Sequence, residues 1–201
     1  MAMRTGTRRK LLDAAEELFF THGIAATPVD AVLDRAGVSS ATLYREWGSK
    51  EALVAAALDR RHDEWTATWD RALAAAGDDR ARLDAVFDAL DAFRSTPTGS
   101  RWCAFLGTAA ELADAPEEVR AVLSRETDTL RDRLTAAAEP LVGASDAPAL
   151  AEDLLLVVSG ALAMRLRDGR AGTATARAVA DAVVHAHAER TTSKTSHGTP
   201  G

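Results

Sequence analysis

The sequence is poor in cysteine and in aromatic residues, and each shortage excludes a class of protein. Cys103 is the only cysteine, so neither an intramolecular disulfide nor a cysteine-based zinc cluster is possible. A single tyrosine and few β-branched runs, beside abundant alanine, favour helix over sheet. The chain has 47% hydrophobic and 27% charged residues, which is ordinary for a globular protein. The composition therefore predicts an all-α protein in a reducing compartment.

Long hydrophobic runs are also missing. The longest, Leu154 to Met164, has 11 residues, whereas a bilayer span needs about 20. The basic N-terminus is not followed by the uninterrupted apolar stretch of a signal peptide. We therefore expect a cytoplasmic protein with no membrane partner.

The net charge of −6 argues against a protein that coats nucleic acid without sequence choice, but the charge is unevenly spread. Residues 1–50 hold seven basic and six acidic side chains, a net charge of +1, and the remainder holds 17 and 24, a net charge of −7. Four of those seven basic residues lie within the first ten: Arg4, Arg8, Arg9 and Lys10. Because local charge decides contact with phosphate, we expect the N-terminal arm to meet DNA and the acidic remainder to face away from it.

Apolar residues at helical spacing, interrupted by Gly and Pro, predict about nine helices. The first three are expected at 8–22, 28–36 and about 39–47, and a long fourth at 50–76. Later helices are expected around 83–93, 101–113, 116–140, 148–168 and 173–190, with Pro140 and Gly143 ending the seventh. The predicted organisation is a three-helix head at 1–52, a helical ligand-binding and dimerisation body at 53–190, and a disordered polar tail at 191–201.

The stretch from Thr27 to Leu53, TPVDAVLDRAGVSSATLYREWGSKEAL, has the pattern of a helix-turn-helix. Two short helices meet at a tight turn around Gly37, which lets one cross the DNA backbone while the next enters the major groove. We interpret Leu43 and Trp47 as core residues, so the opposite face of the third helix would read DNA. The residues predicted to contact DNA are Arg8, Thr27, Ser39, Ser40, Ala41, Thr42, Tyr44, Arg45 and Lys50.

These residue types suit different parts of a DNA interface. Small and hydroxyl side chains permit close approach to base edges, and a Thr methyl can contact the thymine methyl. Tyr44 and Lys50 suit phosphate contacts, which set register. Thr27, at a helix N-terminus, combines a hydroxyl with free backbone N–H groups and predicts a phosphate seat. For Arg45 a base or phosphate contact and a solvated side chain are both open.

The chain resembles the TetR family of bacterial regulators. The resemblance rests on T-P-V near a helix start, A-G-V-S at the turn, T-L-Y-R in the third helix and S-K-E-A-L opening the fourth, and it covers about residues 8–58. It implies a homodimer, a divergent ligand-binding body and repression relieved by a small molecule. In the family, the positions matching Thr27, Ser39, Thr42, Tyr44 and Lys50 contact DNA.

The sequence departs from the usual family pattern in the third helix. Ser40 stands where Lys or Arg is frequent, and Ala41 where Gly is frequent. Glu46 and Trp47 replace a common His-Phe pair. Ser40 and Glu46 lower the local positive charge, which shifts phosphate contacts towards the N-terminal arm.

Aromatic residues are concentrated in the body, where an apolar effector pocket and ordinary core packing are both open readings. As a cluster, and given the resemblance, they predict a pocket for a small apolar effector. The predicted lining is Trp65, Trp69, Phe87, Phe93, Trp102, Phe105 and Met164. The last two helices carry small residues and an apolar run, LLLVVSGALAM, typical of a helix buried on all sides, and they predict the interface of a two-fold homodimer. An internal core helix is the alternative.

No catalytic or metal-binding pattern stands out, and we expect no cofactor. His185 and His187 are two apart on a helix and face different directions. Cys103 is interpreted as a buried thiol rather than a redox switch. The predicted function is a ligand-responsive transcriptional regulator that represses from a palindromic operator. The alternative is a helical ligand carrier or enzyme with an incidental three-helix head.

Overall fold

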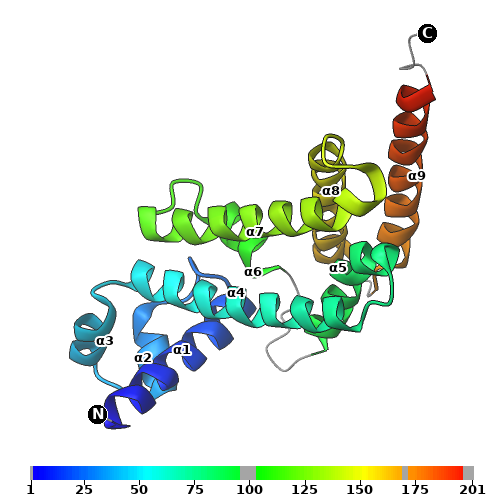
Figure 1. Cartoon of the computed structure of the whole chain (residues 1–201). Helices are drawn as coiled ribbons and strands as arrows, with labels where there is room; N and C mark the ends of the chain where they lie inside the picture. The colour runs from blue at the N-terminus through cyan, green and yellow to red at the C-terminus, as the bar shows by residue number, and fades with distance from the viewer. Residues whose placement is uncertain (1, 96–102, 169–171, 197–201) are drawn as a thin grey trace. The chain divides into compact units, whose positions relative to one another are not determined.

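The computed structural model describes residues 2–95, 103–168 and 172–196, and throughout these ranges the regular structure is α-helical, as expected (Figure 1). The helices are α1 (Ala2–His22), α2 (Val29–Ala36), α3 (Ser40–Trp47), α4 (Lys50–Ala75), α5 (Asp79–Arg94), α6 (Ala104–Glu111), α7 (Glu117–Val142), α8 (Ala147–Asp168) and α9 (Ala174–Ser196).

Three helix ends differ from those predicted. Helix α1 begins at Ala2 and so includes the backbone of the predicted arm. Helix α9 continues to Ser196, past the point at which a disordered tail was expected to begin. Pro140 lies inside α7 rather than at its end. Because Pro140 has no N–H, it removes one helical hydrogen bond two residues before α7 ends at Val142.

The chain divides into two compact units, and each consists of separate stretches of sequence. Unit 1 comprises residues 1–64 and 96–126, and unit 2 comprises residues 65–95 and 127–201. The division falls within α4 and within α7, so each of these helices contributes to both units. The predicted organisation places all residues after 52 in one body, whereas unit 1 also holds the start of α4, all of α6 and the start of α7.

Unit 1 packs the first three helices around one apolar core. Leu11 and Phe19 of α1, Val32 of α2, Leu43 of α3 and Leu53 of α4 are almost completely buried in it. Side chains from α6 and the start of α7 complete it: Ala104, Phe105, Val119 and Val122. The core therefore joins the three-helix head to α6.

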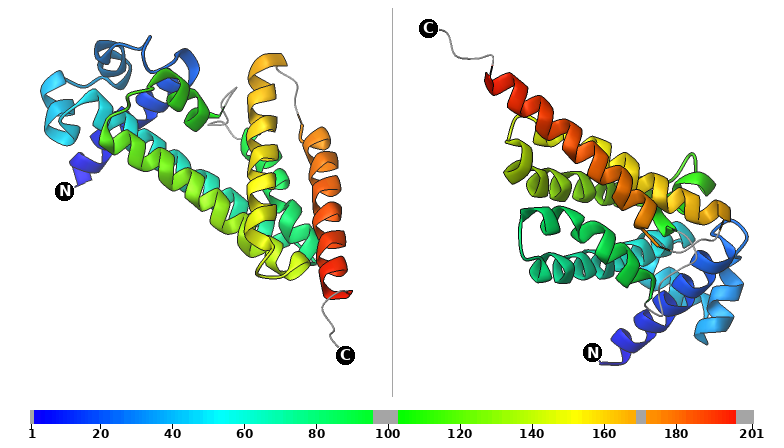
Figure 2. Two further views of the ribbon diagram at one scale, coloured as in Figure 1. Left: turned by 90° about the horizontal axis from the view of Figure 1, so that it is seen from above. Right: turned by 90° about the vertical axis from the view of Figure 1, so that its right-hand side faces the viewer.

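Unit 2 has its own core, built from the end of α4, from α5, and from α7 to α9. Trp69, Phe87 and Leu134 are among its most buried side chains. Asp78 caps the start of α5 by accepting a hydrogen bond from the Ala81 N–H at 2.8 Å. Helices α8 and α9 run side by side in both views of Figure 2.

Helix α8 is not buried on all sides, which corrects one of the two readings of its apolar run. Leu156 is 74% exposed and Met164 51% exposed, although Leu154 and Val158 are buried. By length and composition, Ala147–Arg167 could also cross a membrane, with a mean hydropathy of 1.6 and 28% of its apolar window buried. The prediction that no segment reaches that length was wrong, because a span tolerates the few charged residues that flank the apolar run. Core helices pass the same test, so the property is weak evidence for a membrane.

Candidate nucleic-acid interface

The turn between α2 and α3 has the geometry that the motif predicts. Gly37 ends α2 with φ +66°, in the left-handed region where a side chain would be strained. Its N–H donates to the Asp34 carbonyl at 3.2 Å, and the Val38 N–H donates to the Leu33 carbonyl at 3.1 Å. These bonds satisfy the last carbonyls of α2 and turn the chain sharply into α3.

Helix α3 is held by one face and leaves the other free. Leu43 is completely buried, and Trp47 is half-buried against the same core. The predicted reading residues on the opposite face are exposed: Ser39, Ser40, Ala41, Tyr44 and Arg45. Thr42 is half-buried, and its hydroxyl lies 3.0 Å from that of Ser39. The Arg45 guanidinium lies 3.6 Å from the Glu46 carboxylate, a loose pair on an exposed surface.

Arg8 is connected to α3 through an aromatic ring. Its guanidinium carbon lies 4.7 Å from the centroid of the Trp47 ring, which is cation–π geometry. Arg8 is otherwise exposed. Trp47 therefore has two roles, because it packs in the core and also holds a basic side chain beside α3. The sequence predicts both residues but not their contact.

Thr27 and Lys50 are engaged within the head instead of projecting from it. Thr27 is 3% exposed, and its hydroxyl donates to the Gly23 carbonyl at 2.7 Å. The Lys50 ammonium donates to the Ile24 carbonyl at 2.6 Å and lies 5.7 Å from the centroid of the Phe19 ring. Both side chains stabilise the loop between α1 and α2. The Thr27 hydroxyl has thus already donated its hydrogen, whereas the Lys50 ammonium keeps further N–H groups for a phosphate, and both phosphate contacts stay predictions.

The same loop has a partner that the sequence does not predict. The Glu111 carboxylate, at the end of α6, accepts a hydrogen bond from the Ala25 N–H at 2.9 Å. The two residues are 86 positions apart, so no periodicity or local motif signals the contact.

Buried ionisable groups lie behind the head, between α1, α4, α6 and α7. Glu16 and Arg60 form an ion pair with 2.5 Å between Oε1 and Nε, and burial raises the pKa of Glu16 despite this pair. His62 Nδ1 lies 2.6 Å from Glu126 Oε2, with the edge of the Phe105 ring against the imidazole. Desolvation also raises the pKa of the Cys103 thiol, although the residue is only half-buried and not fully buried as predicted.

The structure separates the residues predicted to line an effector pocket. Trp65, Trp69, Phe87 and Phe93 meet in unit 2, where the Trp65 ring centroid lies 5.5 Å from that of Trp69 and 5.8 Å from that of Phe93. Phe105 belongs to the core of unit 1. Met164 lies on the exposed side of α8, and Trp102 is outside the described residues.

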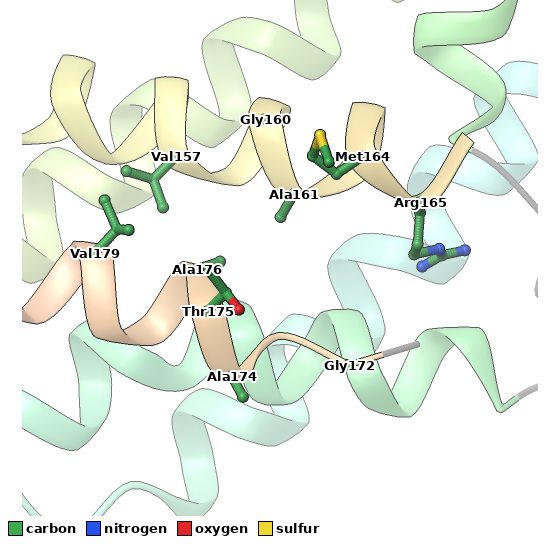
Figure 3. Close-up of a pocket in the computed structure, with 10 residues that line it drawn as sticks. All are labelled: Val157, Gly160, Ala161, Met164, Arg165, Gly172, Ala174, Thr175, Ala176 and Val179. Carbon is green, nitrogen blue, oxygen red and sulfur yellow. The ribbon is translucent and has the colours of Figure 1, made fainter. Parts of the chain in front are cut away.

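An open groove of about 440 Å³ runs between α8 and the start of α9 (Figure 3). Figure 3 shows Val157, Gly160 and Ala161 on one wall and Val179 and Ala176 on the other. Met164 and Arg165 lie at one end. In the described part of the chain, no cluster of three or more His, Cys, Asp or Glu side chains could hold a metal ion.

Comparison with known proteins agrees with the geometry of the head. The family model for bacterial regulatory proteins of the tetR family matches residues 11–57, which run from α1 into α4. This chain belongs to the TetR family. The match includes the turn at Gly37 and all of α3, so the family's reading helix is α3.

Two curated TetR-family relatives are similar over the N-terminal part. The chain is 35% identical over 96 residues to the HTH-type transcriptional repressor KstR2 of Rhodococcus jostii, covering 46% of this chain and 47% of that protein. It is 40% identical over 86 residues to the HTH-type transcriptional activator FasR of Mycolicibacterium smegmatis, covering 43% and 39%. The aligned part thus spans less than half the length of either relative. Both are named as transcription regulators and neither as an enzyme.

Similarity in structure extends over most of the chain. The TetR-family regulator SCO4454 of Streptomyces coelicolor superposes with a TM-score of 0.72 and 28% identity, over 93% of this chain and 94% of that one. The body therefore has the TetR-family fold even where its sequence has diverged.

Proposed function

We propose that the protein is a transcriptional regulator that binds a palindromic DNA operator as a homodimer, in the cytoplasm where that DNA lies. The observation that carries the proposal is α3, a short helix anchored by Leu43 behind the Gly37 turn, with a free face of small, hydroxyl and basic side chains. A major groove admits such a helix, and small side chains let it approach the base edges.

On this proposal the side chains around α3 divide into two kinds. Ser40, Ala41 and Arg45 face the base edges, where an arginine can bond a guanine through two hydrogen bonds. Tyr44, 54% exposed, and Arg8 contact the phosphates beside the groove. The first set gives sequence choice, and the second gives affinity and register.

The dimer is proposed to form through α8 and α9. Each chain has one α3, so a palindrome requires a second copy related by a two-fold axis. Two exposed apolar side chains on the same side of α8, Leu156 and Met164, would meet their copies across this axis. The family relationship supports a second copy of the chain, and not a membrane, as the partner that covers these side chains. The two reading helices would then lie about 34–36 Å apart, one turn of DNA.

Control is proposed to come from a small, mainly apolar effector that binds near Trp65 and Trp69. Their indole N–H groups are buried and have no hydrogen-bond acceptor among the described residues. Because an unsatisfied buried donor is costly, an effector with a suitably placed oxygen would satisfy one of them. Both tryptophans lie on α4, which begins at the head, so the effector can act by favouring one inclination of that helix.

Repression relieved by the effector is the direction we propose, although the two curated relatives are named as a repressor and an activator. Release requires that the effector bind the DNA-free form better than the DNA-bound form. By linkage, operator DNA must then weaken effector binding by the same factor.

Selection of bound duplexes from a random DNA pool tests the proposal. We expect an inverted repeat, bound by two chains, and loss of its sequence preference at one base pair per half-site in R45A. Recovery of no enriched sequence would overturn the proposal and favour the carrier or enzyme alternative. Enrichment of single half-sites bound by one chain would overturn the dimer. Repeating the selection with candidate effectors identifies those that release the DNA.

A further inference from the structure

The loop between α1 and α2, residues 23–28, determines where α2 begins. Gly23 ends α1 with φ +94°, and its N–H donates to the Phe19 carbonyl at 3.0 Å. Thr27 is bonded back to Gly23 at the other end of the loop. Helix α2 starts two residues later, at Val29. The direction of α2, and through the Gly37 turn that of α3, therefore depends on how this loop is held.

Two side chains from elsewhere in the sequence hold the loop. Lys50 binds the Ile24 carbonyl from the start of α4. Glu111 binds the Ala25 N–H from the end of α6, so successive residues are held by a cation and by an anion. The Glu111 fit is close, because a Cβ atom added at Gly23 would lie 3.0 Å from Glu111 Oε1. Because Gly23 has no side chain, the Glu111 carboxylate can approach the loop closely.

Helix α6 is itself firmly anchored at its other end. Ala104, Phe105 and Thr108 are buried in the core of unit 1. The Phe105 ring packs edge-on against His62 of α4, and His62 in turn bonds Glu126 of α7. A helix with a buried start and a carboxylate at its end can transmit a displacement to what that carboxylate holds.

We propose that Glu111 is a positioning residue for DNA binding, which holds the loop at Ala25 and so makes the place of α2 depend on α6. This inference rests on the proposed DNA-binding function. It assigns to Glu111 the task of fixing the loop from which α2 starts.

The test compares three variants of the full chain. E111A removes the acceptor, E111Q keeps an amide oxygen in its place, and D114A removes one negative charge from an exposed residue three positions further on. Loss of a negative charge near DNA should by itself strengthen binding. If DNA affinity falls in E111A but not in E111Q or D114A, the loss therefore cannot come from the change in charge.

Two readouts are needed, and the first uses no DNA. Hydrogen exchange of the peptide spanning residues 21–28 should be about tenfold faster at Ala25 in E111A and near wild type in E111Q and D114A. The second is affinity for the duplex recovered by selection. We expect about a five- to tenfold loss in E111A, with E111Q and D114A within about twofold of wild type.

Wild-type affinity in E111A would overturn the proposal, even if the loop exchanged faster. If DNA affinity and melting temperature fell together while hydrogen exchange at Ala25 stayed unchanged, Glu111 would have only a structural role. That outcome would also overturn the proposal. Failure of the wild type to bind any duplex would instead refute the proposed function, and the exchange data would still decide whether Glu111 holds the loop.

Discussion

Helix α3 in unit 1 and helix α8 in unit 2 both leave one face uncovered, but the two faces differ in chemistry. The free face of α3 carries Ser40, Ala41, Tyr44 and Arg45, and most of these groups hydrogen-bond well to water. The free face of α8 carries Leu156 and Met164, which are 74% and 51% exposed. Neither surface is needed to complete the core of its own unit.

This difference in chemistry suits the α3 face to transient binding and the α8 face to a permanent interface. The groups of α3 exchange a bond to water for a bond to DNA, so α3 is stable with or without its partner. An exposed apolar face costs about 25 cal/mol for every Å² left in water, which favours permanent cover. The polar face thus suits a reversible contact, and the apolar face suits a lasting one between two copies of the chain.

The largest expected effect comes from placing a charge on the apolar face. L156E should weaken the dimer by about 3 kcal/mol, roughly 100-fold, because the carboxylate would be buried without a partner. The side chain is exposed in a single chain, so each subunit should still fold. Sedimentation equilibrium measures the change, and A136E on the exposed side of α7 is the matched control. If L156E dimerised as strongly as the wild type, something other than a second chain would cover α8. Co-sedimentation of the wild type with lipid vesicles would then identify that partner as a membrane.

A second contrast between the units lies in their buried ionisable groups. Unit 1 buries Glu16, Arg61, His62 and Glu126, whereas among the described residues of unit 2 only His187 is buried. We therefore expect the pH dependence of stability to originate mainly in unit 1.

Glu16 gives that expectation a sign. Its folded pKa is raised by burial, so its contribution to stability is fully present below the ordinary pKa of 4.5 and is lost as the pH rises through the folded value. Relative to wild type, E16Q should therefore gain stability as the pH rises from 4.5, by about 1.4 kcal/mol for each unit by which the pKa is raised. Urea unfolding across this range measures the difference. A relative gain by the wild type would mean that the Arg60 pair outweighs burial.

The smallest effect concerns the edge of the polar face, where Arg8 meets Trp47. A double-mutant cycle of R8A and W47L, read as DNA-binding free energy, should give a coupling of about 0.5–1 kcal/mol. R9A, which removes a neighbouring exposed arginine, should be additive with W47L. Additivity in both cycles would place Arg8 outside the reading surface. If the salt dependence of binding fell by one phosphate contact in R8A but not in W47L, the phosphate contact would belong to the Arg8 guanidinium itself.

The parts of the fold that depend on local chemistry could be predicted from the sequence. Gly37 and Gly48 mark the ends of α2 and α3, because a left-handed or otherwise positive φ at a helix end selects glycine. The exposed face of α3 follows from the position of Leu43 alone. Of the two residues predicted to end α7, the helix passes Pro140 by two residues and ends directly before Gly143, whose φ is +81°.

The contacts that tie the head together could not be predicted. Lys50 and Thr27 have the chemistry of phosphate ligands, and nothing in their sequence neighbourhood reveals that carbonyls of the α1–α2 loop lie within their reach. Glu111 looks like one more surface carboxylate until α6 is placed beside that loop. For α8, an apolar run is compatible with a core, a dimer or a membrane, and only the position of neighbouring helices shows which side chains remain exposed.

Helix α3 depends on one fully buried side chain, and this has a consequence for how the protein can change over generations. Leu43 and the ring of Trp47 secure the helix, so Ser40, Ala41, Tyr44 and Arg45 can be exchanged without an expected loss of folding stability beyond about 0.5 kcal/mol each. Selection can therefore alter the DNA sequence that is read one position at a time, while the scaffold tolerates every intermediate. A library randomised at these four positions should yield mostly folded proteins, from which variants that bind new operator sequences could be selected.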